Sequence, residues 1–397
     1  MKIYEIGTGY TPIPAQVAAA TESVVEELTK SYIGMDQPVE IIDISAPKRA
    51  KHNLPITEVS VPSFFTKEDV SLGIVHKIKR VVYSVALAYK LKRILKNENE
   101  KAVLHFHNQY NLFFFLKLVP KKLRAKALVA YTNHNGMWSK NWNDVKDLLY
   151  KRYFQEIFSM KNADQVFVLN EETRKNVIEQ LGIEAERVIK ISNGVNTDIY
   201  CPISQSEIEE TKKKYKINGK KVILQVGSVY ENKGQARAVE MLSPLLKKHD
   251  ELIYAYVGGI VSQEYSETVR KTAESLGVSD KVVYLGTAVP GTEMNRLYNI
   301  ADITFFASEY EGFPLVCIES VSAGVPVVIC SDINIDLGPG CIVTSKEKTE
   351  SDIEKKVFSC YDEYKKLCLS ARENAENNYS WQKIARKYLT AFIEGEN

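Results

Sequence analysis

Short apolar runs alternate along this chain with longer segments in which apolar residues recur every three or four positions. An apolar run of four to seven residues between turn-forming residues predicts a buried strand, and a longer periodic segment predicts a helix with one apolar face. In the first half, strands are predicted at residues 3–7, 39–44, 56–61, 102–107, 127–133, 165–169 and 188–192. Helices are predicted between them, at residues 15–31, 72–96, 110–118, 143–158 and 172–181. Strands and helices that alternate in this way are typical of a parallel sheet covered by helices on both faces.

The second half repeats the alternation, with strands predicted at residues 222–226, 252–257, 282–285, 303–307 and 327–330. A length of 397 residues is too great for one ordinary core and fits two domains of roughly 150 to 200 residues. Turn residues and charges interrupt the pattern between residues 192 and 214. We therefore expect two Rossmann-like domains, at residues 1–195 and 205–378, followed by a terminal helix over residues 379–397 with Ser380 as its cap.

Glu311 and Glu319 lie eight positions apart, between the predicted strand at residues 303–307 and the sequence Ala-Gly-Val-Pro at residues 323–326. The segment is expected to form a loop, a short helix and a glycine stop, with Glu311 in the loop and Glu319 about two turns into the helix. Backbone N–H groups at the start of a helix bind phosphate, and carboxylates accept hydrogen bonds from hydroxyls. The arrangement suits a nucleotide sugar. The alternative is that Glu311 only caps the helix and that Glu319 is a solvated helix residue.

The residues that follow Glu311 make the pattern more specific, and they are Gly312, Phe313, Pro314 and Leu315. With them, the segment resembles the Glu-x7-Glu motif of the retaining family 4 glycosyltransferases, which have the GT-B fold. The resemblance implies an α/β fold of two Rossmann-like, doubly wound domains facing a cleft, with the C-terminal helix packed back on the first domain. It also implies that Glu311 contacts the donor sugar, that Glu319 binds the ribose of the nucleotide, and that the residues after Glu311 line the donor site.

A second donor element follows the strand at residues 222–226, where the chain carries Gly227, Ser228, Lys233 and Gly234. A lysine near a helix N-terminus neutralises a pyrophosphate, and glycine lets the backbone approach it closely. The segment resembles the family pattern Gly-Arg-Leu-x3-Lys-Gly, which implies that Lys233 binds the diphosphate. Ser228 replaces the arginine and offers a single hydrogen bond in place of a bidentate charge. Taken alone, Lys233 would be a solvated surface residue.

In the first half, the sequence from Thr132 to Asn135 resembles the Thr-x-His-Asp of the family, with Asn135 in place of the aspartate. The resemblance implies that His134 helps to position the donor sugar. His105 and His107 resemble a His-x-His motif and are expected to support the floor of the cleft rather than take part in the chemistry.

The first loop departs from the family pattern. Family members carry Gly-Gly-x-Glu at the first helix, whereas residues 18–22 read Ala-Ala-Ala-Thr-Glu. Alanine does not adopt the positive φ angles that glycine allows. We therefore expect the phosphate contact at Gly9, in the preceding loop.

The sequence contains no Asp-x-Asp pair and no cluster of His, Cys and carboxylates with metal-ligand spacing. A metal-independent reaction without a cofactor is therefore expected, in which Lys233 and backbone dipoles stabilise the departing nucleoside diphosphate. The family resemblance implies that the anomeric configuration is retained by a front-face displacement, in which the acceptor hydroxyl attacks as the diphosphate leaves on the same side.

The composition, 45% hydrophobic and 26% charged, is typical of a soluble globular protein. The six cysteines form no Cys-x-x-Cys pair, and buried free thiols in a reducing compartment are expected. The sequence begins directly with a predicted strand, and it has no apolar stretch of the roughly 18 residues that a spanning helix needs. These features predict a cytoplasmic protein.

Positive charge is concentrated in one segment, because residues 67–126 contain 14 Lys and Arg against 4 Asp and Glu. Apolar and aromatic residues recur among these charges, which is typical of a surface that lies on an anionic membrane. The alternative is an ordinary core stripe with a solvated edge of lysines. Nucleic acid is not an expected partner, because no binding motif accompanies the charge.

Together these features predict a glycosyltransferase, at the inner face of a cell membrane, that moves a sugar from a nucleotide-diphosphate donor to a growing glycan or lipid-linked saccharide. Capsule, lipopolysaccharide and similar surface polysaccharides fit this class. One alternative is another GT-B enzyme, a nucleotide-sugar epimerase or a phosphorylase. A second alternative is a non-catalytic partner that binds nucleotide sugars or glycans. The donor sugar, the acceptor and the linkage depend on the pocket and are not predicted.

Overall fold

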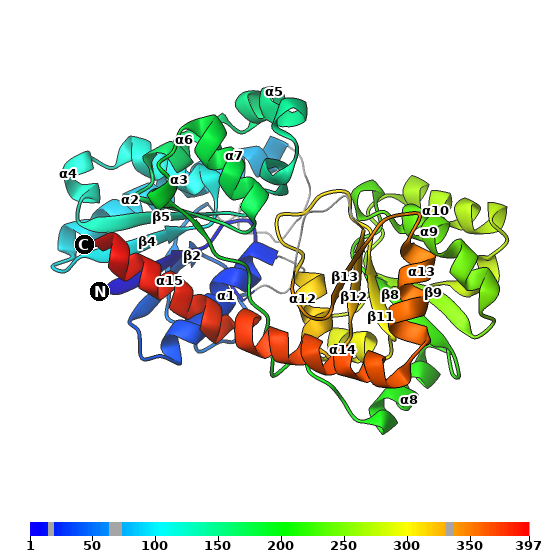
Figure 1. The fold of residues 1–397 in the computed structure, drawn as a ribbon. Coiled ribbons are helices and arrows are strands. Elements are labelled where there is room, and N and C mark those ends of the chain that lie inside the picture. Colours follow the sequence, from blue (N-terminus) through cyan, green and yellow to red (C-terminus); the bar gives the residue numbers. More distant parts are fainter. Residues whose placement is uncertain (15–19, 63–73, 331–336, 397) are drawn as a thin grey trace. The chain divides into compact units, whose positions relative to one another are not determined.

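The computed structural model describes residues 1–14, 20–62, 74–330 and 337–396 (Figure 1). The chain divides into two compact units, which we call unit 1 (Met1–Asn193 and Trp381–Asn397) and unit 2 (Gly194–Ser380). Each unit is built on one parallel sheet with helices on both faces. The chain therefore begins in unit 1, passes through unit 2 and returns to unit 1.

Unit 1 contains a seven-stranded parallel sheet in the order β3-β2-β1-β4-β5-β6-β7. Its central strands are almost wholly apolar because helices cover both faces of the sheet. The strands are β1 (Lys2–Ile6), β2 (Val39–Ile44), β3 (Ile56–Val59), β4 (Ala102–Phe106), β5 (Ala127–Asn133), β6 (Gln165–Val168) and β7 (Val188–Lys190).

Two separate apolar layers fill the space between this sheet and its helices. On one face, residues such as Leu87, Phe106 and Phe115 form the larger core beneath α2 (Ile74–Asn97) and α3 (Gln109–Leu118). The other helices of unit 1 apart from α1 and α15 are α4 (Lys121–Arg124), α5 (Trp142–Arg152), α6 (Phe154–Asn162) and α7 (Glu171–Leu181). The opposite face is covered by α1 (Ala20–Ile33) and by α15 (Trp381–Glu396), which pack against each other (Figure 1).

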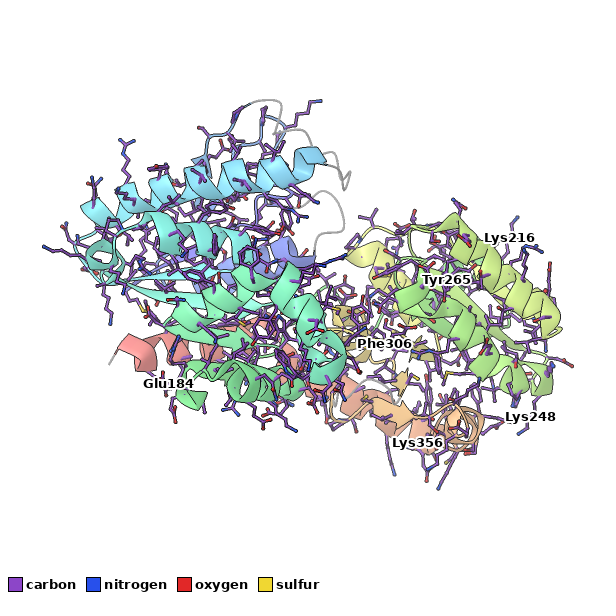
Figure 2. All side chains as sticks on the ribbon, turned by 90° about the horizontal axis from the view of Figure 1, so that it is seen from above. Glu184, Lys216, Lys248, Tyr265, Phe306 and Lys356 are labelled. Carbon is purple, nitrogen blue, oxygen red and sulfur yellow. The ribbon has the colours of Figure 1, made fainter. Side chains whose placement is uncertain are left out.

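Unit 2 contains a six-stranded parallel sheet in the order β10-β9-β8-β11-β12-β13. Its strands are β8 (Lys221–Val226), β9 (Leu252–Val257), β10 (Val282–Tyr284), β11 (Ile303–Phe306), β12 (Val327–Cys330) and β13 (Cys341–Thr344). Its helices are α8 (Gln205–Lys214), α9 (Gln235–Lys248), α10 (Gln263–Ser275), α11 (Thr292–Asn299), α12 (Leu315–Ser322), α13 (Thr349–Ile353) and α14 (Tyr361–Asn374). In Figure 2, Phe306 lies inside this unit, whereas Lys216 and Lys248 lie at its outer surface.

The strand order fixes where a ligand can bind in each unit. β1 lies between β2 and β4, and β8 lies between β9 and β11. The strand order therefore reverses at β1 in unit 1 and at β8 in unit 2. In open parallel sheets, ligands bind beyond the carboxyl ends of the strands at such switch points. The loops after β1 and β4 in unit 1, and after β8 and β11 in unit 2, are therefore the places to search for functional side chains.

The structure differs from the sequence predictions at several points. The single helix predicted over residues 143–158 is two helices, because Tyr153 leaves the helical region at φ −121° and ψ 26°. β13 was not predicted, since its four residues are too short to show an alternation clearly. The helix after Glu311 begins at Leu315, so Glu319 lies just over one turn into it and not two. The stretch at residues 15–19 lies outside the described residues.

Candidate active site

Lys233 and Glu311 form an ion pair at the switch point of unit 2. Lys233 ends the short helix η4 (Glu231–Lys233) in the loop after β8, and Glu311 lies in the loop after β11. The side chains are 22% and 19% exposed, so the pair is reachable from solvent while still largely shielded. Two residues 78 positions apart thus meet where the fold places ligands. A cation and a carboxylate held there can contact an anionic group and a hydroxyl of the same ligand.

Two glycines with positive φ, Gly227 and Gly234, lie in the backbone around Lys233. Gly234 has φ 68°, and a side chain there would overlap the carbonyl of Ala307. Gly227 has φ 153°, and the aliphatic part of Lys233 passes over it at 3.5 to 3.7 Å from the position of a Cβ atom. The close approach to Ala307 therefore requires glycine at residue 234, and the Lys233 side chain packs over the backbone at Gly227.

Buried amides anchor the same loop. The Gln225 side chain donates to the carbonyl of Lys233 at 2.6 Å and accepts from the Tyr254 hydroxyl at 2.7 Å. The Gln235 side chain donates to the carbonyl of Ser228 at 3.1 Å. Gln225 and Gln235 belong to no sequence motif that we recognised, and sequence reasoning missed both.

Glu319 lies on α12 beside two tyrosines. The Tyr298 hydroxyl donates to its Oε2 atom at 2.7 Å. Burial raises the pKa of the Glu319 carboxyl, whereas hydrogen bonds from Tyr298 and Tyr200 act in the opposite direction. The Glu319 side chain is therefore fixed by hydrogen bonds and is not a freely solvated helix residue. The residues from Gly312 to Leu315 connect Glu311 to the start of the same helix.

Gly9 lies in the loop after β1, at the switch point of unit 1. Its φ is 78°, and a side chain there would overlap the ring of Tyr83. Asn111 and Tyr83 hold the neighbouring backbone, since both donate to the carbonyl of Gly7, at 3.0 and 3.2 Å. Packing alone accounts for the glycine, and the phosphate contact at Gly9 stays a prediction.

A buried carboxylate holds the loop that carries His134. Glu156 on α6 accepts hydrogen bonds from Tyr131 at 2.8 Å, from Asn135 at 2.9 Å and from Trp138 at 2.7 Å. Burial raises the pKa of the Glu156 carboxyl, although the hydrogen bonds from these three donors act to lower it. The contact explains why this position carries Asn135, because an aspartate would bring a second carboxylate against Glu156. Sequence reasoning missed Glu156.

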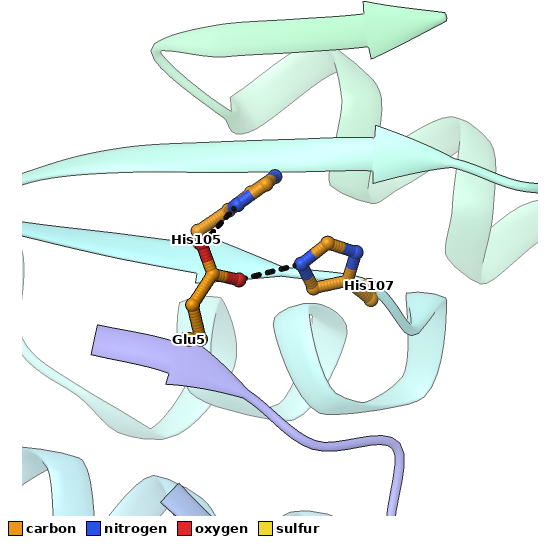
Figure 3. Close-up of side chains that lie close together, drawn as sticks. All are labelled: Glu5, His105 and His107. Atoms are coloured by element: carbon orange, nitrogen blue, oxygen red, sulfur yellow. Dashed lines mark hydrogen bonds and ion pairs between the residues drawn. The ribbon is translucent and has the colours of Figure 1, made fainter. Parts of the chain in front are cut away.

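Glu5, His105 and His107 form a buried cluster in the middle of the unit 1 sheet (Figure 3). The Glu5 carboxylate contacts His105 Nδ1 at 2.9 Å through Oε1 and His107 Nε2 at 2.7 Å through Oε2. Glu5 on β1 lies directly opposite His105 on β4 in the parallel register. Sequence reasoning identified the two histidines but missed Glu5, about one hundred residues away.

These three residue types also bind metal ions, and their ligand atoms lie within 4.8 Å of one another. Each carboxylate oxygen, however, is at hydrogen-bond distance from one imidazole nitrogen. The oxygen lone pairs therefore face imidazole N–H groups and do not converge on one position that a metal ion could occupy. The geometry is therefore that of a hydrogen-bonded chain. It continues to His134, whose Nε2 lies 3.0 Å from His107 Nδ1.

The apolar residues of α2 are divided between a buried and an exposed side of the helix. The buried side consists of Tyr83, Leu87, Leu91 and Leu95, whereas Ile78, Val81 and Tyr89 are exposed. Exposed lysines lie on α3, on α4 and just after it, and both helices contact α2. We use the term basic surface for the exposed cations of these three helices and of the residue just after α4, which are Lys77, Arg93, Lys96, Lys117, Lys121, Lys122 and Lys126.

Both halves of the chain match known families. Residues 207–377 match the glycosyl transferases group 1, and residues 21–199 match glycosyltransferase family 4. The chain belongs to the family 4-type glycosyltransferases. It is 25% identical to mannosylfructose-phosphate synthase of Agrobacterium fabrum over 62% of this chain and 56% of that one. It therefore spans little more than half the length of that relative.

Two further relatives match over most of their length. An O-antigen biosynthesis glycosyltransferase of Escherichia coli, WbnH, is 24% identical over 85% of this chain and 89% of its own. Spore coat protein SA of Bacillus subtilis is 22% identical over 99% of both chains.

Solved structures show that the fold is GT-B. Anabaena HepE in complex with UDP and glucose has a TM-score of 0.71 at 15% identity, over 99% of both chains. Sucrose-phosphate synthase of Thermosynechococcus elongatus has a TM-score of 0.73 at 15% identity, over 99% of this chain and 98% of that one. Among the described residues of this family member, no helix has the length and apolar character needed to cross a bilayer.

Proposed function

We propose that this protein is a retaining, metal-independent glycosyltransferase that moves a sugar from a nucleoside diphosphate donor to a growing glycan. The observation that carries the proposal is the pair of Lys233 and Glu311 at the switch point of unit 2. A charged amine suits the diphosphate, and a carboxylate suits the sugar hydroxyls. Membership of the family and a solved GT-B structure that contains UDP support the same donor class.

Each predicted site residue then has a role in the proposal. Lys233 binds the diphosphate, and Ser228 adds one hydrogen bond. Glu311 binds the donor sugar. Gly312, Phe313 and Leu315 offer backbone N–H groups in the segment after it, whereas Pro314 has none. Glu319 accepts from a ribose hydroxyl, which a carboxylate already oriented by Tyr298 is well placed to do. The proposed donor contacts of Gly9 and His134 rest on the sequence alone.

The proposed reaction is a front-face displacement. The acceptor oxygen forms a bond to the anomeric carbon while the bond from that carbon to the β-phosphate oxygen breaks on the same side. The acceptor hydroxyl proton passes to an oxygen of the departing β-phosphate. Lys233 neutralises the charge that develops on the leaving group, and such preorganised charge is a large source of transition-state stabilisation.

The acceptor is proposed to be a surface polysaccharide or its lipid-linked precursor. Relatives in O-antigen biosynthesis and in the spore coat support this class. The basic surface supports a location beside an anionic membrane, because exposed Ile78, Val81 and Tyr89 lie on the helix that carries several of its cations.

Donor turnover tests the proposal. The purified protein is incubated with individual nucleotide sugars with and without EDTA, and release of the nucleoside diphosphate is measured. Slow hydrolysis of one donor that survives EDTA is expected, and Glu311→Gln should abolish it. NMR of the first-formed sugar product, or of the glycoside made with an acceptor, should show the anomeric configuration of the donor. Absence of turnover with every donor, together with tight nucleotide binding, would identify a non-catalytic binding protein instead.

A further inference from the structure

A continuous hydrogen-bonded chain connects the middle of the unit 1 sheet to His134. Glu5 contacts His107 Nε2 at 2.7 Å, and His107 Nδ1 contacts His134 Nε2 at 3.0 Å. Glu5 is fully buried and His107 is 4% exposed, whereas His134 is partly exposed. Within the described residues, the second nitrogen of His134, Nδ1, makes no hydrogen bond. The chain therefore ends on a ring nitrogen with no partner in that part of the protein.

The ionised carboxylate of Glu5 fixes the position of every proton along this chain. A carboxylate only accepts hydrogen bonds, so His107 must carry its proton on Nε2. A neutral His107 then has a bare Nδ1 and accepts from His134, which must carry its proton on Nε2. A neutral His134 consequently presents a bare Nδ1. The tautomer of one ring is set by the partner of the ring before it.

The charge states that this argument needs agree with the surroundings of the three groups. Burial opposes ionisation of Glu5, but the charges and hydrogen bonds of His105 and His107 outweigh it and lower the Glu5 pKa to about 2. Burial and the nearby His105 lower the pKa of His107 to about 4. Burial, followed by the two neighbouring histidines, places the pKa of His134 well below its ordinary value.

A second arm leaves Glu5 in the other direction. His105 donates from Nδ1 to Glu5, and its Nε2 lies 2.7 Å from the hydroxyl of Thr132. That hydroxyl lies 3.3 Å from the Tyr388 hydroxyl on α15. This arm is buried throughout and leads away from His134, so it provides a control that shares Glu5 but not the exposed end.

We propose that Glu5 and His107 are positioning residues that lock His134 in the tautomer with a bare Nδ1, so that His134 accepts a hydrogen bond from a ligand hydroxyl. The identity of the ligand, a donor sugar, rests on the proposed function. The tautomer lock does not, because it follows from contacts within unit 1.

NMR of protein labelled with ¹⁵N in its six histidines tests the lock directly without substrate. In the wild type at pH 7, His134 and His107 should each show one tautomer, protonated on Nε2. His134 protonated on Nδ1, or an even mixture, would overturn the proposal. Stoichiometric zinc in the purified protein would also overturn it, because a metal would take the nitrogen lone pairs.

Two variants separate the arms. Thr132→Val removes the hydroxyl beside His105 and should leave the His134 signals unchanged. The double variant Glu5→Gln/Thr132→Val replaces the carboxylate with an amide, which has one oxygen and one NH2 group. If His105 keeps its proton on Nδ1, the amide oxygen must face His105. The amide N–H then points towards His107. His107 must then carry its proton on Nδ1 and donate to His134, so His134 should change to the Nδ1-protonated form. An unchanged His134 in a folded double variant whose His105 is still protonated on Nδ1 would refute the lock, and the same NMR spectrum reports both rings.

Kinetics add a readout that depends on the proposed function. The donor KM of the double variant should rise roughly two- to tenfold relative to Thr132→Val, the range for weakening one neutral hydrogen bond, with a smaller change in kcat. An inactive wild type with the expected tautomer would refute the proposed function and leave the lock standing. An active double variant with a changed tautomer and an unchanged KM would refute the contact between His134 and the donor.

Discussion

Lys233 and Glu311, which belong to separate loops of unit 2, form an ion pair at the carboxyl ends of β8 and β11. Without a ligand each group satisfies the charge of the other. A diphosphate attracts the lysine and repels the glutamate, so we infer that donor binding opens this pair. Removing either partner takes this ion pair away from the other, partly shielded charge. The effect of a variant at one position therefore includes the cost of disturbing the second.

Lys233→Gln is expected to reduce turnover by at least about a hundredfold, because the lysine opposes charge that develops only in the transition state. Ser228→Arg in the same background should recover part of the loss, since it restores a cation where the family pattern has one. Nucleoside diphosphate release measures both variants. Lys346→Gln, an exposed lysine paired with Glu240, is the control and should retain wild-type turnover. A failure of Ser228→Arg to recover any activity would argue against a diphosphate at this position.

Glu319→Gln should weaken nucleoside diphosphate binding by about 1.5 to 3 kcal/mol, the value of one hydrogen bond to a charged acceptor. Isothermal titration with uridine and guanosine diphosphates measures this loss. Glu363→Gln, on the exposed side of α14, provides a matched carboxylate far from any assigned contact. Equal affinities in the wild type and in Glu319→Gln would exclude Glu319 from the ribose site.

Asn135→Asp restores the residue that the family pattern has at this position, yet it should destabilise this protein. The new carboxylate would face buried Glu156 where the Asn135 amide now donates at 2.9 Å. A loss of at least about 2 kcal/mol in the free energy of unfolding is expected, because one of the two carboxylates must stay unpaired or take a proton. Asn143→Asp, in the exposed first turn of α5, is the control and should cost little. Equal stabilities would show that the loop accommodates a second carboxylate.

The stability of unit 1 should decrease as the pH is lowered from about 6.5 to about 4, because His107 is harder to protonate in the folded state than in the unfolded state. Burial and His105 lower its pKa to about 4, so the folded state disfavours the protonated ring that the unfolded state accepts from about pH 6.5 downwards. The stabilisation is complete above pH 6.5 and amounts to at most about 3 to 4 kcal/mol, the free energy that corresponds to lowering the pKa from 6.5 to about 4. The titratable groups that face His107 are Glu5, His105 and His134.

Tryptophan fluorescence during urea unfolding measures this effect in unit 1 alone, because all three tryptophans lie there: Trp138, Trp142 and Trp381. His107→Gln removes the titrating ring and keeps a donor for Glu5. The difference in the free energy of unfolding between wild type and variant should stay constant above pH 6.5. Below pH 6.5 the wild type should lose more stability than the variant. A difference that does not change with pH would contradict the assignment.

The basic surface should bind anionic vesicles. Replacing Lys117, Lys121, Lys122 and Lys126 with glutamate is expected to abolish sedimentation with phosphatidylglycerol vesicles, since each basic residue near such a surface contributes about 1 kcal/mol. Wild-type binding should weaken steeply with salt. The same change at four exposed lysines of unit 2, Lys355, Lys356, Lys365 and Lys366, controls for net charge. A wild type that stays in the supernatant at low salt would leave these lysines as a solvated face.

Local sequence patterns predicted most strands and two Rossmann-like domains, because buried parallel strands are continuous apolar runs. The GT-B fold was implied by the family resemblance. The motif carrying Glu311 and Glu319 was also visible, since its residues are close in sequence. The residues that hold the site were not. Glu5, Glu156 and Gln225 act through contacts across strands or helices, and nothing in their local sequence records the partner. The break at Tyr153 was hidden for the same reason, because a continuous helical pattern runs through it.

The return of α15 to unit 1 has a consequence for the order in which the protein is made. Ile384, Tyr388 and Phe392 cover a sheet face that includes Ile3 and Phe167. During synthesis the part of this apolar face that α15 covers stays exposed while all of unit 2 emerges from the ribosome, although unit 1 supplied the first strands and α1 covers the rest. A nascent unit 1 is therefore exposed to aggregation and chaperone binding until α15 is released. Loss of this sixteen-residue helix would damage the beginning of the protein rather than its end.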